Sequence, residues 1–135
     1  MAHCNGAENV DTALGCGVDS IEHGYFIGAE HLVEMSALRV IWTPTFAPLA
    51  NYLAAGVTSP GQQSVLRRTL AAHAENLRLA VESGVLVAVG SDAGASFVPH
   101  GQGAEDELEC FVRAGIEREA ALRLMNENGA LALGI

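Results

Sequence analysis

The chain has 135 residues, half of them hydrophobic and 17% charged, which fits one globular domain and excludes a disordered segment. Its formal net charge of −9 excludes the basic footprint that nucleic acid or an anionic membrane surface would need. No apolar run approaches the ~20 residues of a membrane span, no signal peptide is evident, and three widely spaced cysteines indicate reduced thiols, so we expect a cytoplasmic protein.

The first part of the chain alternates helical and strand-like segments. Residues 8–14 predict a helix that ends at glycines, and residues 18–21 then predict a short strand. A second helix is expected over residues 29–38. The β-rich run 40–43 follows it and stops at Pro44.

The second part opens with residues 44–60, whose length predicts a lid or a substrate-binding loop. Leucine, alanine and valine recur every three or four residues over 66–81, which predicts a helix that ends before Gly84. The unbroken apolar run 85–89 predicts a strand leading to Asp92. Three short helices are expected at the end of the chain, over residues 104–114, 118–124 and 127–133.

Helices that alternate with short strands favour an α/β protein with a parallel sheet, and apolar strands indicate burial on both faces. Polar residues follow each strand: His3-Cys4-Asn5, Glu22-His23, Thr43 and Ser91-Asp92. Because the carboxyl ends of parallel strands meet at one edge of a sheet, we expect these residues to share one rim.

His3, His23 and Asp92 form the most informative set on this rim. Each is soon followed by a glycine, which lets the backbone turn away from the side chain. Two imidazoles and one carboxylate suit zinc or a similar divalent ion. A single histidine at a strand end is usually structural, but three such residues at three strand ends favour a site.

Two phrases are distinctive: Gly-Val-Asp-Ser-Ile-Glu-His-Gly at 17–24 and Val-Gly-Ser-Asp-Ala-Gly at 89–94. They resemble the amidohydrolase superfamily, in particular its imidazolonepropionase-like and Xaa-Pro or acyl-amino-acid dipeptidase-like members. Supporting phrases are Ala-His-Cys-Asn-Gly at 2–6, Trp-Thr-Pro-Thr at 42–45, Val-Pro-His-Gly-Gln-Gly at 98–103 and Asn-Gly-Ala-Leu-Ala-Leu-Gly-Ile at 128–135. The resemblance covers essentially the whole chain.

The resemblance implies a partial (β/α)8 TIM barrel in which this chain supplies the fifth to eighth parallel strands, with helices outside. It implies that His3 and His23 bind a divalent metal, most simply zinc, from the fifth and sixth strands. Asp92, on the eighth strand, would touch the metal and act as general base. The implied reaction is hydrolysis of a C–N amide bond in a small, amino-acid-derived or dipeptide substrate.

The sequence also departs from the family pattern. The family's first-strand His-x-His pair, its fourth-strand lysine and its small β domain have no counterpart, so residues 1–135 are expected to be the C-terminal half of the catalytic barrel. A catalytically silent half barrel with a structural or assembly role therefore stays open, as does a metal-binding module without turnover. Open strand edges predict a homo-oligomer, most simply a two-fold dimer.

Two further residues are candidate substrate contacts. His100 lies in the loop after the last strand, and Tyr25 follows the His23-Gly24 turn; an exposed loop residue and a packing residue are the respective alternatives. We expect His31 and His73 to lie on helix surfaces.

Glu22 is expected to form a structural pair on the strand face away from His23. Ser91 lacks the sequence context of a catalytic nucleophile and is expected to bond a turn.

Overall fold

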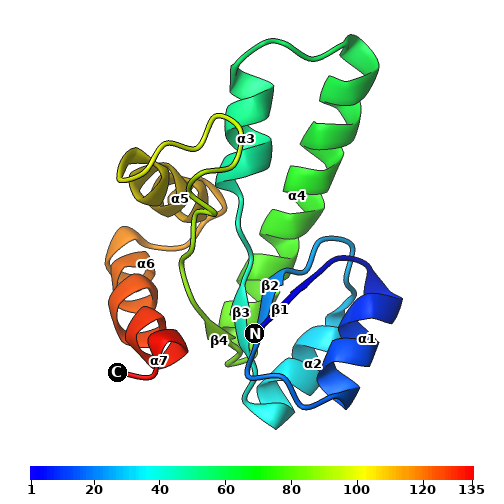
Figure 1. Cartoon of the computed structure of the whole chain (residues 1–135), viewed down its shortest axis with the longest axis vertical. Coiled ribbons are helices and arrows are strands. Elements are labelled where there is room, and N and C mark those ends of the chain that lie inside the picture. Colours follow the sequence, from blue (N-terminus) through cyan, green and yellow to red (C-terminus); the bar gives the residue numbers. More distant parts are fainter.

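Four short strands form one parallel sheet with the order β1-β2-β3-β4. The computed structural model describes all residues, 1–135, and Figure 1 shows the sheet between its helices. The strands are β1 (Ala2–Cys4), β2 (Ser20–His23), β3 (Ile41–Thr43) and β4 (Leu86–Val87). At least one helix lies between every two consecutive strands, as parallel pairing requires. The predicted α/β architecture with parallel strands is confirmed.

Most helices lie where the sequence predicts them. They are α1 (Ala7–Gly15), α2 (Ala29–Leu38), α4 (Pro60–Glu82), α5 (Gln102–Arg113), α6 (Arg118–Arg123) and α7 (Gly129–Leu133), with a π-helical turn, η1 (Leu124–Asn128), between the last two. The longest helix, α4, starts at a capping box in which Ser59 accepts from the backbone N–H of Gln62 and Gln62 accepts from that of Ser59. None of the helices is both long and apolar enough to cross a bilayer.

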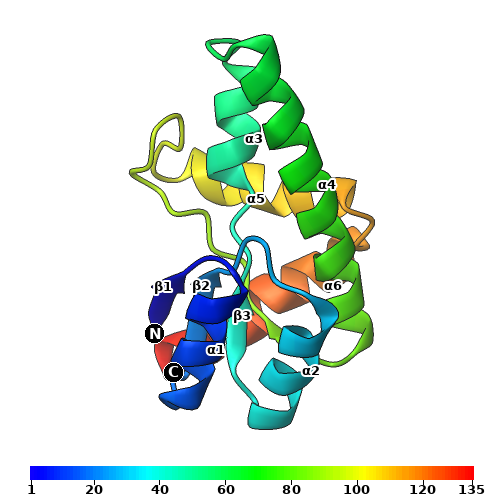
Figure 2. The same ribbon diagram turned by 90° about the vertical axis from the view of Figure 1, so that its right-hand side faces the viewer.

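The prediction of a loop over residues 44–60 is wrong in part, because helix α3 (Ala47–Ala54) lies inside it, while its role as a lid or substrate-binding segment stays a prediction. Its N-cap is Phe46, whose side chain accepts no hydrogen bond, so no local polar residue marks the helix start. Figures 1 and 2 show α3 and α4 side by side as a hairpin that extends beyond the end of the sheet. Because α3 follows β3 directly, this end is the carboxyl edge.

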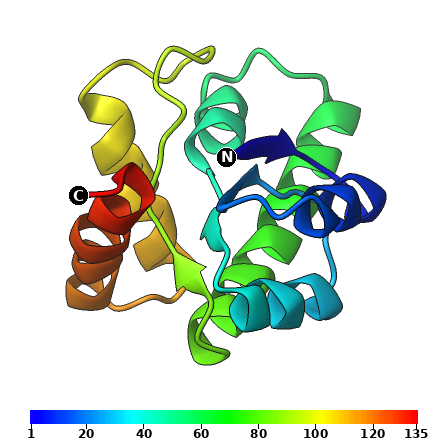
Figure 3. The ribbon, with the colours of Figure 1, turned by 60° about the horizontal axis from the view of Figure 1, so that its bottom comes forward.

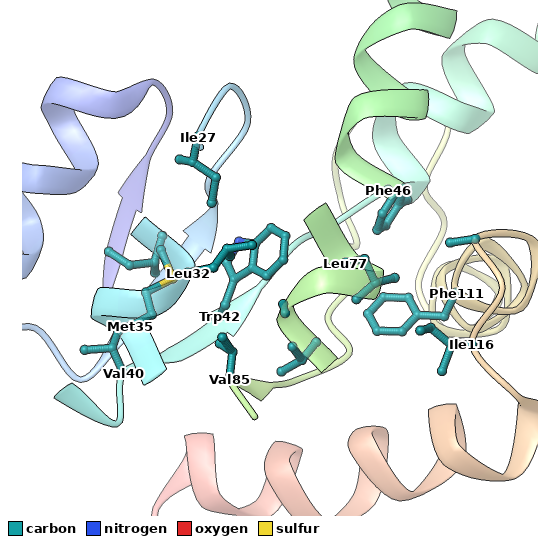
Figure 4. Packing of buried hydrophobic residues seen from close by; sticks show 14 of the residues in the cluster. Ile27, Leu32, Met35, Val40, Trp42, Phe46, Leu77, Val85, Phe111 and Ile116 are labelled. Atoms are coloured by element: carbon teal, nitrogen blue, oxygen red, sulfur yellow. The ribbon is translucent and has the colours of Figure 1, made fainter. Parts of the chain in front are cut away.

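One face of the sheet is apolar and holds the core. Ile21, Trp42 and Val87 belong to a cluster of 19 buried residues, and none of these three side chains is exposed. Figure 4 shows Leu77 of α4 between Trp42 and the side chain of Phe111 on α5. Packing of α2, α4 and α5 on this face removes the apolar surface from water, and this is the main contribution to stability.

The opposite face of the sheet is mixed, because Ile41 and Leu86 lie on it together with polar residues nearer the carboxyl edge, so the expectation of strands apolar on both faces holds only in part. His3 is in register with Glu22, and Glu22 with Thr43, so these three side chains share one face. The C-terminal helices lie beside β4 in Figure 3. There Asn128 donates from Nδ2 to the carbonyl oxygen of Val87 at 2.7 Å.

Candidate metal centre

His3 and His23 lie in direct contact at the carboxyl edge of the sheet. The Nε2 atom of His23 is 2.9 Å from Nδ1 of His3, and the two rings meet edge to face with centroids 4.4 Å apart. Strand register pairs His3 with Glu22, so regular alternation would turn His23 to the other face. His23 has φ 67° instead, a left-handed conformation that reorients its side chain at the strand end.

The backbone after His23 is fixed by Trp42. The indole Nε1 donates to the carbonyl oxygen of His23 at 3.0 Å, and both groups are buried. Gly24 has φ 63°, and a Cβ at this position would lie 2.7 Å from the same indole nitrogen. Gly24 is therefore required both by its conformation and by the close approach of Trp42.

Asp92 lines the same pocket as the two histidines. The pocket has a volume of about 310 Å³, and its walls are Met1, His3, Glu22, His23, Thr43, Thr45, Gly90 and Asp92. Asp92 also has a left-handed backbone, φ 54°. Left-handed non-glycine residues cost free energy and are often found at functional sites. All three predicted ligands thus share one pocket.

The three predicted ligands do not form a closed cage. No group of three or more histidine, cysteine, aspartate or glutamate side chains lies close enough together to hold a metal ion in this structure. The preformed part is the pair of imidazoles.

The His23 imidazole is held in its neutral form. Burial lowers its pKa, the neighbouring His3 lowers it further, and the carboxylates of Asp92 and Glu22 act in the opposite direction. A neutral imidazole has one nitrogen with a lone pair that can bind a metal ion, and its tautomer decides which nitrogen this is.

Tyr25 lies behind His23 and does not line the pocket. Its ring stacks on the His23 ring with centroids 6.1 Å apart, and its hydroxyl donates to the carbonyl oxygen of Thr45. Burial raises the pKa of this hydroxyl, so it stays protonated and can serve as the donor. The structure therefore gives Tyr25 a supporting position next to His23.

His100 is exposed and also lies outside the pocket walls. Its Nε2 atom would be 3.8 Å from a Cβ at Gly94, so it belongs to the loop that follows Asp92. Glu22 accepts a hydrogen bond from the Ser20 hydroxyl at 2.7 Å, which confirms its predicted structural pairing. Glu22 lines the pocket because its side chain shares the sheet face of His3. The expectation that it points away from His23 is wrong, since His23 turns toward that same face.

The expectation that His31 and His73 lie on helix surfaces is wrong, since each is only 2% exposed. His31 accepts from the backbone N–H of Gly28 at 3.0 Å and lies 3.3 Å from Asp11. His73 donates from Nε2 to the carbonyl oxygen of Pro44 at 2.6 Å.

His73 also has an aromatic environment, because the rings of Tyr25, Trp42 and Phe46 surround it with centroid separations of 4.5, 5.3 and 4.7 Å. Burial lowers its pKa to about 4, so the ring is neutral. The spacing Leu70, His73, Leu77 could have revealed its burial, since it places His73 on the apolar side of α4.

The sequence analysis missed Glu107, a fully buried carboxylate on α5. It accepts hydrogen bonds from the backbone N–H groups of Phe46 and Ala47, with the shortest distances 2.8 and 2.6 Å. Burial raises its pKa to about 7, while these two N–H bonds act in the opposite direction. Its position between Gly103 and Phe111 on the apolar face of a helix was the signal in the sequence.

No protein-family model and no curated protein matches the chain. Solved structures do match it. A putative prolidase from Bifidobacterium longum is 30% identical with a TM-score of 0.77, and a Xaa-Pro dipeptidase with bound methionine is 28% identical with a TM-score of 0.79. An amidohydrolase is 20% identical with a TM-score of 0.79. Each match covers 98% of this chain. It covers 35% of the prolidase chain, 33% of the dipeptidase chain and 32% of the amidohydrolase chain.

The chain matches part of an amidohydrolase-superfamily structure. It spans about a third of the length of these amidohydrolase and prolidase structures. The resemblance seen in the sequence is thereby confirmed, and the four-stranded parallel sheet fits a partial amidohydrolase barrel.

Amidohydrolases of this kind are generally metal-dependent, so the fit of a metal to the pair of histidines can be tested. Two imidazole nitrogens bound tetrahedrally to zinc at ~2.0–2.1 Å lie roughly 3.3 Å from each other. The nitrogens of His3 and His23 are 2.9 Å apart and are joined by a hydrogen bond. A small separation of the rings and loss of the shared proton would accommodate an ion, so the two histidines fit the group, and Asp92 would complete the ligand set only after moving closer.

Proposed function

We propose that this chain provides the metal-binding and proton-transfer part of an amidohydrolase that cleaves a C–N amide bond in a small substrate. Strands β1 to β4 then correspond to the fifth to eighth strands of the barrel. The observation that carries the proposal is the contact of His3 with His23 in a pocket that Asp92 also lines. Active sites of such barrels lie at this carboxyl edge.

In this proposal each pocket residue has one role. His3 Nδ1 and His23 Nε2 hold a divalent metal ion, and Asp92 completes the site. When bound, the ion supplies a Lewis acid that activates water near neutral pH and polarises the amide carbonyl. Asp92 accepts the proton of the attacking water and returns it to the nitrogen as the C–N bond breaks. Two imidazoles and a carboxylate favour zinc.

The names of the similar structures support the substrate class. The Xaa-Pro dipeptidase acts on dipeptides by its name and has methionine bound in its active site, and a prolidase structure contains N-methylphosphonate-L-proline. We therefore propose a dipeptide or another amino-acid-derived amide as substrate. His100, on the loop after Asp92, is the proposed contact with the substrate from this chain, and Tyr25 contributes by supporting His23.

The test is metal analysis of the purified chain combined with hydrolysis of a panel of dipeptides and N-acyl amino acids. We expect one zinc per chain, loss of zinc in His23→Ala, and retained zinc in the control His100→Ala, which removes an imidazole outside the pocket. Asp92→Asn should keep part of the zinc affinity and lose turnover, because the amide cannot accept the proton.

The same experiment separates the alternatives. Bound zinc without cleavage of any amide would indicate a metal-binding module. A metal-free, inactive chain would contradict the proposal and favour a structural half barrel.

We further propose that the chain self-associates through β1. The sheet is open, so β1 and β4 each have one edge without a strand partner. Asn128 already bonds to Val87 of β4, and the free edge of β1 is left to pair with a second copy. Sedimentation at micromolar concentration should show a dimer, and a stable monomer would contradict this proposal.

A further inference from the structure

Three polar side chains from distant parts of the chain fix one short backbone segment, residues 44–47. His73 of α4 donates to the carbonyl oxygen of Pro44 at 2.6 Å. The hydroxyl of Tyr25 donates to the backbone carbonyl oxygen of Thr45. Glu107 of α5 accepts from the next two backbone N–H groups. We call these three side chains, Tyr25, His73 and Glu107, the backbone clamp.

Glu107 makes the most unusual contact of the clamp. The first N–H groups of a helix have no partner within that helix, and Phe46 at the N-cap of α3 offers no side-chain acceptor. Glu107 replaces the missing cap from 60 residues away in the sequence. No basic side chain pairs with Glu107 in the structure. Its carboxylate is therefore committed to these two backbone groups.

The clamp reaches the candidate metal centre by two routes. Thr45, whose carbonyl accepts from Tyr25, lines the pocket and has a left-handed backbone with φ 55°. On the other side, the Tyr25 ring neighbours the rings of both His23 and His73, with centroids 6.1 and 4.5 Å away. A shift of residues 44–47 would therefore move both a wall of the pocket and the ring that supports His23.

We infer that Glu107 is a positioning residue of the candidate metal centre, which acts through residues 44–47 and Tyr25 to hold His23 against His3. The inference rests on the proposed function, because it assigns Glu107 a purpose at that metal site. Groups that orient metal ligands without touching the metal often contribute 10–100-fold in metal affinity.

The test compares Glu107→Gln with Glu105→Gln, a matched control at an exposed position of the same helix. Glutamine keeps the shape of the side chain, but its NH2 group replaces one carboxylate oxygen and cannot accept, so a single neutral oxygen is left for the two backbone N–H groups that both carboxylate oxygens now serve. Two readouts are used on the full chain: titration with Co²⁺ alone, followed by its visible absorption, and the imidazole nitrogen chemical shifts of His3 and His23.

We expect about tenfold weaker Co²⁺ binding in Glu107→Gln, with altered His23 shifts, and neither change in Glu105→Gln. Circular dichroism must show that both variants stay folded. If Glu107→Gln unfolds, Tyr25→Phe serves instead, since it removes the bond to Thr45 and keeps the ring. Tyr25→Phe should also weaken Co²⁺ binding and alter the His23 chemical shifts, but by smaller amounts.

Unchanged Co²⁺ affinity and unchanged His23 shifts in the folded variant would overturn the inference and leave Glu107 as a helix cap only. If the unmodified chain binds no Co²⁺, the proposed function fails, and the chemical shifts alone decide the inference. A change of the His23 shifts in Glu107→Gln then still supports positioning, and identical shifts refute it.

Discussion

The Nδ1 atom of His3 and the Nε2 atom of His23 lie 2.9 Å apart across two neighbouring strands. One of these nitrogens must donate and the other accept, so the pair shares a proton that a metal ion would replace. His3 is exposed. Its loss would leave only one buried group, the ring of His23, without its hydrogen-bond partner. The contact is therefore better suited to ligand binding than to stabilising the fold.

His3→Ala should separate these two roles. We expect the free energy of unfolding in urea to fall by only about 1 kcal/mol, because the lost side chain is exposed and its removal leaves one buried group, the ring of His23, without its partner. Zinc affinity measured by calorimetry should fall at least about 100-fold, since one of the two preformed ligands is gone. A large loss of stability with unchanged zinc affinity would show that the pair is structural.

Gly24→Ala should be strongly destabilising. The new methyl group would take a left-handed backbone and would lie 2.7 Å from the indole nitrogen of Trp42. Gly56 has a similar φ of 69° with nothing within 4 Å, so Gly56→Ala measures the backbone cost alone. We expect losses of about 3 kcal/mol at Gly24 and about 1 kcal/mol at Gly56 in urea denaturation. Equal losses would mean that the indole moves away at no cost.

The sequence was informative about these strand ends because the signal there is local. A histidine after an apolar run and before a glycine predicts a side chain at the rim, and the structure brings His3 and His23 together as expected. The local pattern could not predict how His23 turns toward His3, because this depends on a left-handed residue held by Trp42.

Helix α3 and Glu107 were missed for the opposite reason. Proline at positions 44, 48 and 60 indicates loops, and the cap of α3 comes from a residue 60 positions away. A propensity argument cannot include such a partner. Glu107 and His73 were both visible as polar residues on apolar helix faces, and a buried polar group always needs a bonding partner.

The pH dependence of stability should contain two opposing contributions. Burial raises the pKa of Glu107 to about 7 from 4.5. Between these pH values the folded chain holds a proton that the unfolded chain releases. The free energy of unfolding contributed by Glu107 therefore falls as the pH rises from 4.5 to 7. Burial lowers the pKa of His73 to about 4 from 6.5. Between these pH values the unfolded chain binds a proton on His73 that the folded chain does not bind. The free energy of unfolding contributed by His73 therefore falls as the pH drops from 6.5 to 4.

Between about pH 4.5 and 6.5 the two slopes, each up to roughly 1.4 kcal/mol per pH unit, should largely cancel. Glu107→Gln should leave stability rising with pH in this window, and His73→Gln should leave it falling. Urea titrations at about pH 5, 5.5 and 6 measure both. Parallel slopes in the two variants would show that these groups do not titrate as described.

Asn128→Ala should weaken the cover of the β4 edge. The carbonyl oxygen of Val87 would lose its only side-chain donor, at an expected cost of about 1 kcal/mol. A freed strand edge also promotes self-association, which sedimentation would detect. Asn126→Ala, at an exposed position of the same π-helical turn, should change neither quantity. Identical behaviour of the two variants would remove the role assigned to Asn128.

The claim that His3, His23 and Asp92 bind one cation is tested most directly by anomalous X-ray diffraction at the zinc edge from crystals grown with zinc. The account predicts a single strong peak about 2.0–2.1 Å from Nδ1 of His3 and Nε2 of His23, with an Asp92 oxygen as a third ligand. A chain crystallised with saturating zinc that shows no peak in this pocket, or a peak only elsewhere, would contradict it.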